Sequence, residues 1–412
     1  MQLNKSDSLY RFVDYSLIFF PLAIILGSPA VNFYLIIYSL IFLYLSFKLN
    51  FFKWLKIVWV RYFLFFWIYL IINSFFANDF YNSFRGSFSL IRFLLFSLFI
   101  GYFGFKYLKL DKILKVWFLI VLLVSIDVWI QFLFGVDMFG IPSRDSRLSG
   151  PFGDELIVGG FIWKISICIF PYFFYGLFFE KKKKFIKYIF IGVLFILTVL
   201  ITGERMSFLM LIFFTFLIST FINFNNKNKL KIIASLVFLI LSLTFVSSKI
   251  DIVKNRYLDL YNIFLNFNLS SYGKLYVSGY EIWKKNPING VGVKNFRYEC
   301  DLQLENRAPF DHPLCSTHPH NLYIEILSET GLVGMILFTF FLFKFFQFFI
   351  LKSVKMKQKQ KFISLMLLIS FTTLIWPIST SGSFFTTWNG TFYWLLIGFM
   401  FAKLDKTLIL SN

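Results

Sequence analysis

The three histidines of this 412-residue chain, His312, His318 and His320, all lie within one stretch of nine residues. Their segment, DHPLCSTHPHNLYIEILSETG, leads directly into a long apolar run. Imidazole is the side chain whose ordinary pKa permits proton transfer near neutral pH. Because every imidazole of the chain lies in this one segment, we expect the chemistry to take place there.

His320 is the first candidate for a general base. Ser316 or Thr317 is expected to cap a helix whose first turn contains Pro319, because proline is tolerated at that position. His320 would then lie in the first turn, where the positive end of the helix dipole keeps the ring neutral and able to accept a proton. Two other roles stay open: His320 orients the loop, or it positions a substrate hydroxyl.

A metal site is the alternative for the same histidines. His312, His318 and His320 offer imidazoles, and Glu325 and Glu329 follow them. Two ligands separated by one residue suit an extended segment better than a helix. We therefore expect no metal and keep a zinc site as the alternative.

Asn321, Glu325 and Glu329 follow one another at intervals of four residues, so they form one polar stripe on a helix. Such a stripe would be expensive against lipid, and we expect it to face protein or a cavity. The carboxylates would bind substrate hydroxyls or pair with arginines, and the sequence leaves both roles open.

The composition predicts the class of protein. Hydrophobic residues make up 58% of the chain, and apolar stretches of about 18 or more residues, enough to cross ~30 Å of hydrocarbon, recur from end to end. The sequence therefore predicts an all-α integral membrane protein. The net charge of +20 reflects lysines at the ends of apolar spans, as the positive-inside bias predicts. The lipid bilayer is the implied partner, and nucleic acid is not expected.

Twelve transmembrane helices are predicted, within a single polytopic domain over residues 1–412. The basic connections all fall on one side of this helix count, which places that side and both termini in the cytoplasm. One large external loop, 249–321, precedes the tenth helix and is either functional or a small folded cap. The predicted helices cover residues 15–28, 31–47, 58–77, 87–105, 114–134, 156–178, 185–202, 206–224, 232–248, 322–350, 362–380 and 387–403.

Two charged residues, Asp127 and Lys164, fall inside consecutive predicted spans. A charge within a span needs a partner or a polar cavity, and we expect these two to neutralise each other. The alternative is a transporter or flippase with a charged pathway. Polar residues gather at one face of the membrane rather than at its midplane, which disfavours that alternative.

Cys300 and Cys315 both lie in the predicted external loop, whereas Cys168 lies in a span. The external side of the membrane is oxidising, so a disulfide between Cys300 and Cys315 is one expectation and two free thiols are the other. The bond would close a small loop just before the histidines.

Several motifs together resemble the O-antigen ligase and O-antigen polymerase superfamily of integral membrane glycosyltransferases. They are PINGVGVKNFRYEC, CSTHPHNLYIEILSETGLVG, RLSGPFGDE and TGERMSFLML. The resemblance covers roughly residues 140–345, and the rest of the chain agrees only in being helical. HPHN, with the E-x-x-x-E-x-G spacing that follows it, is the specific part of the resemblance, because the arginine motifs alone are weak signals.

The resemblance implies a GT-C-like fold. It also implies transfer of a glycan from a polyprenyl-diphosphate carrier to an acceptor hydroxyl at the periplasmic face of the bacterial inner membrane. In the ligases the acceptor is the lipid A core, and in the polymerases it is a second lipid-linked glycan; we expect a ligase and keep the polymerase as the alternative. Because the diphosphate already activates the donor, no cofactor is implied, and the sequence has no glycine-rich nucleotide-binding motif.

The resemblance also implies roles for single residues. Arg147 and Arg205 would hold the departing diphosphate, since guanidinium groups stay charged and offer forked donors. Arg297 is a further candidate for a glycan or phosphate contact. His320 would activate or position the acceptor, with His318 in support. For Arg205 the alternative is an interfacial arginine that reaches toward lipid headgroups.

Overall fold

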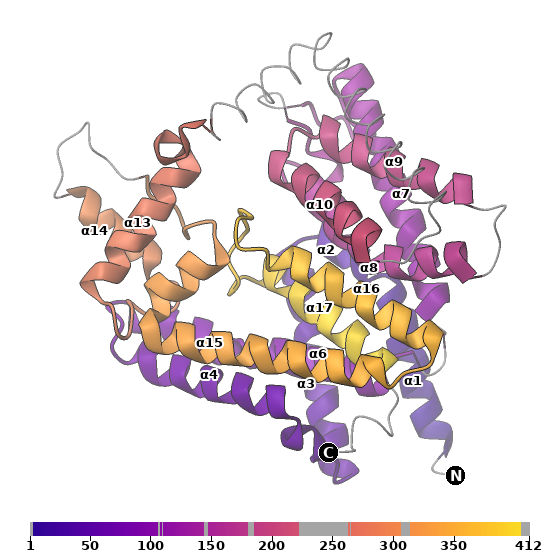
Figure 1. Ribbon diagram of the computed structural model, residues 1–412, viewed down its shortest axis with the longest axis horizontal. Helices are drawn as coiled ribbons and strands as arrows, with labels where there is room; N and C mark the ends of the chain where they lie inside the picture. Colours follow the sequence, from indigo (N-terminus) through magenta and orange to yellow (C-terminus); the bar gives the residue numbers. More distant parts are fainter. Residues whose placement is uncertain are drawn as a thin grey trace. The chain divides into compact units, whose positions relative to one another are not determined.

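The computed structural model describes residues 3–105, 108, 110–143, 147–179, 185–221, 263, 265–305 and 314–404. Over these residues the chain forms helices and their connections, with one isolated antiparallel bridge between Val136 and Pro142 and no strand (Figure 1). The predicted all-α class is confirmed. The chain divides into two compact units, each built from three separate stretches of sequence.

The first unit comprises Met1–Gly27, Phe103–Phe264 and Leu365–Leu374. Its helices are α1 (Leu3–Ile18), α2 (Phe20–Ile25), α7 (Leu110–Phe134), α8 (Val158–Phe179), α9 (Phe185–Ile201), α10 (Arg205–Phe221) and the end of α16 (Gln358–Leu374). The centre of this unit is α8, which packs against α7, α9 and α10. Ser370 on α16 donates its hydroxyl to the Ile167 carbonyl on α8, with an O···O distance of 2.7 Å.

The second unit comprises Ser28–Tyr102, Leu265–Ser364 and Ile375–Asn412. It contains α3 (Ser28–Lys48), α4 (Val58–Ser74), α5 (Phe80–Ser89), α6 (Ile91–Phe103), α13 (Ser271–Lys285), α14 (Phe296–Glu305), α15 (Leu322–Val354), the start of α16 and α17 (Thr387–Lys403). The long α15 runs beside α4 (Figure 1). Aromatic rings fill the interface between these two helices, among them Trp59, Phe63, Phe341 and Phe345.

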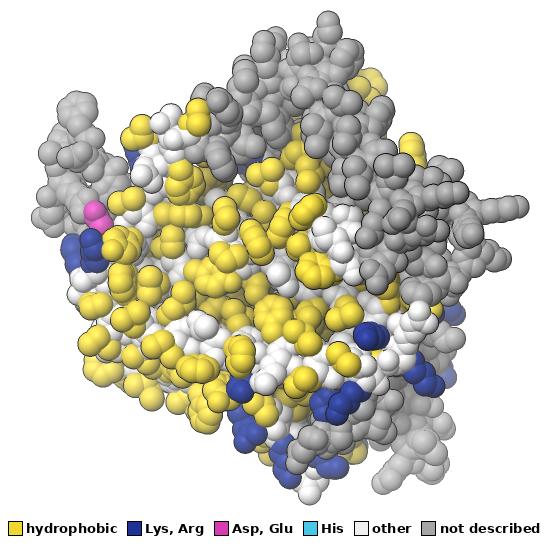
Figure 2. All heavy atoms as spheres, in the orientation of Figure 1, with side chains coloured by type: hydrophobic (Ala, Val, Ile, Leu, Met, Phe, Trp, Pro, Cys, Tyr) yellow, Lys and Arg dark blue, Asp and Glu magenta, His cyan; other side chains and the backbone are white. Residues whose placement is uncertain are grey.

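Among the described residues, five helical segments are long and apolar enough to cross a membrane: Ser28–Lys48, Phe80–Phe103, Leu110–Phe134, Val158–Tyr175 and Leu322–Val354. On α4 and α15 large hydrophobic side chains such as Phe65, Ile68, Phe340 and Phe343 are exposed. Figure 2 shows a described surface on which hydrophobic side chains predominate. Lipid is the environment that favours such a surface, and the protein is a multi-pass membrane protein.

Most predicted helices have a counterpart in the structure, and the range 387–403 coincides with α17. Three predicted ranges were wrong in detail. The range 362–380 is displaced, since α16 covers Gln358–Leu374. The range 15–28 falls on two helices, α1 and α2, because Pro21 opens a new helix after Phe19. The range 87–105 begins too late, since α5 starts at Phe80 after the cap Asp79 and α6 follows it. The predicted helix 232–248 lies outside the described residues, and within the predicted loop 249–321 the described part contains α13 and α14.

Candidate active site

The backbone hydrogen bonds of α15 are interrupted at Gly331, whose backbone is not helical (φ 65°, ψ −168°). The PINGVG segment supplies the missing partners. It donates two hydrogen bonds to α15, from the N–H groups of Val291 and Gly292 to the carbonyls of Ser328 and Glu329 (N···O 3.1 and 2.8 Å). It also accepts two, because the N–H groups of Leu332 and Val333 donate to the carbonyls of Pro287 and Ile288 (N···O 2.9 and 3.2 Å). The two motifs quoted around this site, PINGVG and ETGLVG, therefore form one backbone unit.

Glycine is required on both sides of this unit. Gly290 has φ 68°, and a Cβ there would lie 2.5 Å from the carbonyl carbon of Glu329. A Cβ on Gly331 would collide with the carbonyl of Ile288. From α4, the Tyr69 hydroxyl donates to the Thr330 carbonyl over an O···O distance of 2.7 Å, which gives a further carbonyl beside the break a hydrogen-bond partner. The two segments can approach this closely only because neither carries a side chain at the contact.

The N-terminus of α15 differs from the prediction. The helix begins at Leu322, and the cap is Asn321, whose Oδ1 accepts the N–H groups of Tyr323 and Ile324 at 3.0 and 3.1 Å. Neither Ser316 nor Thr317 caps it, and the placement of His320 in its first turn was wrong. His320 precedes the cap in a left-handed backbone conformation (φ 55°), which is uncommon for residues other than glycine. The backbone N–H of Ser381 donates to the His320 carbonyl at 2.8 Å.

The imidazole rings of His318 and His320 lie against each other, with 4.1 Å between their centroids. Nε2 of His320 is 3.4 Å from Oγ of Ser316, and Nδ1 of His318 is 2.9 Å from Oγ1 of Thr317. The Tyr272 ring of α13 meets the His320 ring edge to face at 5.9 Å. Nε2 of His318 is buried and has no hydrogen-bond partner among the described residues.

Burial governs the charge of these rings. Together with the neighbouring His320, it lowers the pKa of His318 to about 3, and it also lowers the pKa of His320. Both rings are therefore neutral at pH 7 and able to accept a proton. The neutral state was expected from the helix dipole, but its cause is desolvation, because His320 does not lie in the helix.

The polar stripe of α15 is buried, as the cost of exposing it to lipid predicts: Asn321 is 4% exposed, and Glu325 and Glu329 are 1% exposed. Oε2 of Glu325 accepts the Phe384 N–H at 2.8 Å. Oε1 of Glu329 accepts the Phe296 N–H at 3.3 Å. These carboxylates thus hold two neighbouring segments of backbone, a role that was not among those considered from the sequence.

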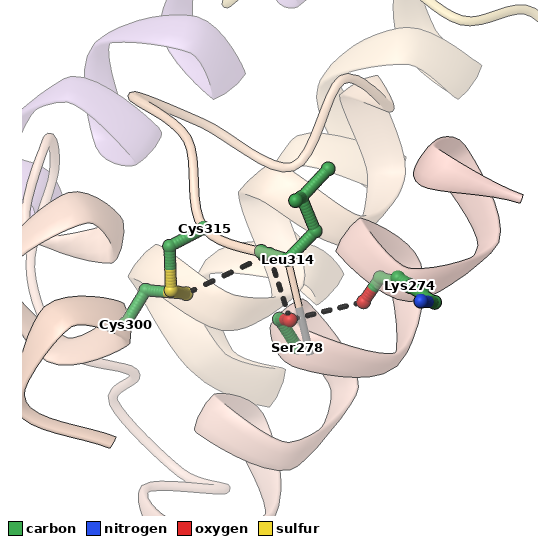
Figure 3. The surroundings of a disulfide bond; sticks show 5 residues. All are labelled: Lys274, Ser278, Cys300, Leu314 and Cys315. Atoms are coloured by element: carbon green, nitrogen blue, oxygen red, sulfur yellow. Dashed lines mark hydrogen bonds between the residues drawn. A yellow bond between two sulfur atoms is a disulfide. The ribbon is translucent and has the colours of Figure 1, made fainter. Parts of the chain in front are cut away.

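Cys300 on α14 and Cys315 form a disulfide, with their Cα atoms 5.7 Å apart (Figure 3). Beside it, Ser278 of α13 donates its hydroxyl to the Leu314 carbonyl (O···O 3.1 Å). The chain therefore enters the histidine segment anchored to both α13 and α14. His312 lies outside the described residues. Among the residues that are described, no group of three or more His, Cys, Asp or Glu side chains is arranged to hold a metal ion.

The predicted arginines divide between the units. Arg297, which is exposed and follows the first residue of α14, belongs to the second unit with the histidines, whereas Arg147 and Arg205 belong to the first. There the Leu148 N–H donates to the Thr202 carbonyl at 3.2 Å, which joins the RLSG and TGER motifs. Nη2 of Arg147 donates to the Leu156 carbonyl at 2.6 Å, and Arg205 is the first residue of α10.

Glu204, between these two motifs, was missed as a positioning residue, although it lies within the quoted TGER. Its carboxylate accepts the N–H groups of Gly159 and Gly160 at the start of α8, at 2.6 and 2.9 Å, and the Ser207 hydroxyl at 2.9 Å. It also interacts electrostatically with Arg147. One carboxylate therefore ties α8, α10 and the Arg147 segment together.

The expected pairing of Asp127 with Lys164 was wrong. Oδ1 of Asp127 accepts the Met138 N–H at 2.8 Å, so this carboxylate holds the turn that follows α7. Lys164 instead interacts electrostatically with Glu204. The error arose because sequence shows which helices are consecutive but not which faces meet.

Residues 190–339 match the family model described as O-Antigen ligase. No curated protein matches the chain. The matched stretch includes the TGER motif, the glycine contact at Gly331 and the histidine pair. The match confirms the resemblance seen in the motifs, and over these residues the chain is similar to the O-antigen ligase family.

Proposed function

We propose that the protein is a membrane glycosyltransferase that moves a glycan from a polyprenyl-diphosphate carrier to an acceptor hydroxyl, and that it acts as an O-antigen ligase on the lipid A core. The observation that carries this proposal is the pair of neutral, largely buried imidazoles His318 and His320 beside the N-terminus of α15, within the family region. A neutral imidazole in a protected site suits the removal of a hydroxyl proton.

In the proposed reaction the acceptor hydroxyl attacks the anomeric carbon of the glycan. The new glycosidic bond forms as the bond to the diphosphate oxygen breaks, and the diphosphate keeps that electron pair and remains on its carrier. His320 takes the hydroxyl proton, and His318 supports its ring. Arg147 and Arg205 stabilise the negative charge that develops on the diphosphate. Direct attack inverts the anomeric centre.

We further propose that the reaction takes place at the periplasmic face of the bacterial inner membrane, with both termini in the cytoplasm. The disulfide between Cys300 and Cys315 supports this orientation, because disulfides persist in oxidising compartments. The pattern of basic connections in the sequence agrees with the same orientation.

The test compares surface lipopolysaccharide and carrier-linked glycan in cells that lack the protein and re-express either wild type or His320→Ala. We expect the deletion and the variant to give lipopolysaccharide whose core lacks the transferred glycan, with long polymer retained on the carrier. A core that bears a single repeat would instead identify a polymerase. An unchanged pattern in the deletion strain would overturn the proposed function.

A further inference from the structure

Four cations of the second unit lie near one another although the sequence separates them widely. Arg85 is on α5, Arg92 is on α6, and Lys294 and Arg297 surround the start of α14. Lys294 interacts electrostatically with the other three, and Arg92 interacts with Arg85. Arg297 also interacts with His318. The cation cluster, defined by these four residues, therefore borders the histidine pair.

Lys294 is held in place by its surroundings. Its backbone is left-handed (φ 63°), which is unfavourable for a lysine. Its side chain passes over Gly86 of α5, where an added Cβ would lie 3.2 Å from Cδ of Lys294. Burial and the neighbouring Arg92 lower the pKa of Lys294. The fold therefore accepts backbone strain, desolvation and charge repulsion to keep this amine where it is.

The acids that border the cluster accept hydrogen bonds from other donors, although Oε2 of Glu329 is buried without a partner among the described residues. Glu325 and Glu329 interact electrostatically with Lys294, and Asp79 with Arg297. Glu325 and Glu329 accept backbone N–H groups, as described above, and Asp79 accepts both the N–H and the side-chain amide of Asn82 at 3.0 and 2.6 Å. In the part of the chain that the structure describes, no ion pair joins any of the four cations to a carboxylate.

Arg92 has the clearest unused donor. One terminal nitrogen, Nη2, donates to Oγ1 of Thr387 at 3.2 Å, and the guanidinium lies over the Phe93 ring, 4.9 Å from its centroid. Nε is buried and has no partner among the described residues. A half-buried arginine within an apolar helix is expensive unless it meets an anion.

We propose that Arg85, Arg92, Lys294 and Arg297 form a binding site for a phosphate or diphosphate group carried by a lipid substrate. Forked guanidinium donors match phosphate oxygens, and Lys294 adds a point charge at the centre of the group. The same chemistry is offered by the diphosphate of the glycan carrier and by phosphates on a lipid acceptor. That the lipid is a substrate rests on the proposed function; that the site binds phosphate does not.

The experiment measures binding to the full-length protein purified in detergent, without transfer. One probe is a short-chain polyprenyl diphosphate, and the other is lipid A core, tested with its phosphates and after their enzymatic removal. The variants are Arg92→Gln, Lys294→Met and Arg85→Gln. Lys284→Ala is the matched control in the same unit, since that lysine lies over the Tyr280 ring at the end of α13.

We expect each of the three variants to weaken the binding of one phosphorylated probe about tenfold, which corresponds to the loss of one charge-assisted bond, and Lys284→Ala to leave it unchanged. Weaker binding of the polyprenyl diphosphate would identify the carrier as the ligand. Weaker binding of the phosphorylated core, without a change in the binding of the dephosphorylated core, would identify the acceptor as the ligand. Unchanged binding of both probes in all three variants would overturn the site.

Arg85 is exposed, so Arg85→Gln tests the site even where Arg92→Gln fails to fold. The outcomes separate this inference from the proposed function. Wild-type protein that binds a phosphorylated lipid through the cluster but transfers no glycan would contradict the transferase and leave the phosphate site standing. If the wild-type protein transfers glycan but the three variants bind both probes as tightly as it does, the phosphate site is contradicted and the proposed transferase stands.

Discussion

The imidazoles of His318 and His320 lie with their ring centroids 4.1 Å apart, and burial lowers the pKa of both. Two imidazolium ions at this distance would repel each other strongly, so at most one of the two rings takes up an additional proton and becomes an imidazolium. A pair of this kind can receive a proton from a substrate and release it afterwards without becoming doubly charged.

Replacing His320 should stop transfer without removing the protein from the membrane. We expect His320→Ala to lower kcat about 10²–10⁴-fold, because a general base of this kind contributes roughly that factor. The measurement is transfer from purified carrier-linked glycan, with membrane abundance checked by blotting. Wild-type rates in the variant would contradict the assignment, and rescue by added zinc would favour a metal site.

The pH dependence should reflect the buried histidines. Since the base must be neutral and the pKa of His320 is lowered, the acidic limb of the kcat profile should fall below pH 6.5, the ordinary value for histidine. Stability should change in the same direction. Between pH 6.5 and about 3 the unfolded chain protonates His318 while the folded chain does not, so the folded state loses stability as the pH falls. An acidic limb at or above pH 6.5 would show that the base is another group.

The glycine contact between PINGVG and α15 should tolerate no side chain. Gly331→Ala places a Cβ against the carbonyl of Ile288 in a backbone conformation that essentially only glycine adopts, and we expect a loss of ~1–3 kcal/mol from the backbone conformation alone, visible as a lower Tm in detergent. The matched control is Gly192→Ala within α9, where an added Cβ meets nothing within 4 Å. Equal Tm values for the two variants would refute the contact.

The disulfide should stabilise the entry to the histidine segment. Cys300→Ser with Cys315→Ser opens a loop of sequence separation 15, which the chain-entropy model values at ~3 kcal/mol. We expect a lower Tm and a lower transfer rate, with the wild-type protein matching the variant after reduction. Non-reducing thiol labelling checks the bond, and Cys168→Ala serves as the control that retains it. A double variant as active and stable as wild type would remove this role.

The helices could be predicted because hydrophobic length determines them. The range 387–403 coincides with α17, in which residues from Asn389 to Phe401 are buried. The start of α15 could not be predicted as well. Ser316, Thr317 and Asn321 can all cap a helix, and the choice of Asn321 depends on its further bond from Nδ2 to the Pro377 carbonyl, at 2.8 Å.

Electrostatic interactions between residues far apart in the sequence could not be predicted. Lys294 lies within a quoted motif, but nothing local indicates that Arg85 and Arg92, some two hundred residues earlier, share its surroundings. Likewise, Glu204 was visible in TGER, but its bonds to Gly159 and Gly160 depend on how α8 and α10 pack. Motifs indicate where chemistry lies along the chain, and only tertiary packing brings together residues from separate motifs.

The break at Gly331 also divides α15 by length. Residues 332–354 alone rise about 35 Å at 1.5 Å per residue, more than the ~30 Å of a hydrocarbon core. The first turns, with Glu325 and Glu329, are therefore not needed to cross the bilayer. When the membrane becomes thinner or thicker, the apolar piece can tilt to compensate, whereas the histidine segment is anchored separately, to α13 through Ser278 and to α14 through the disulfide.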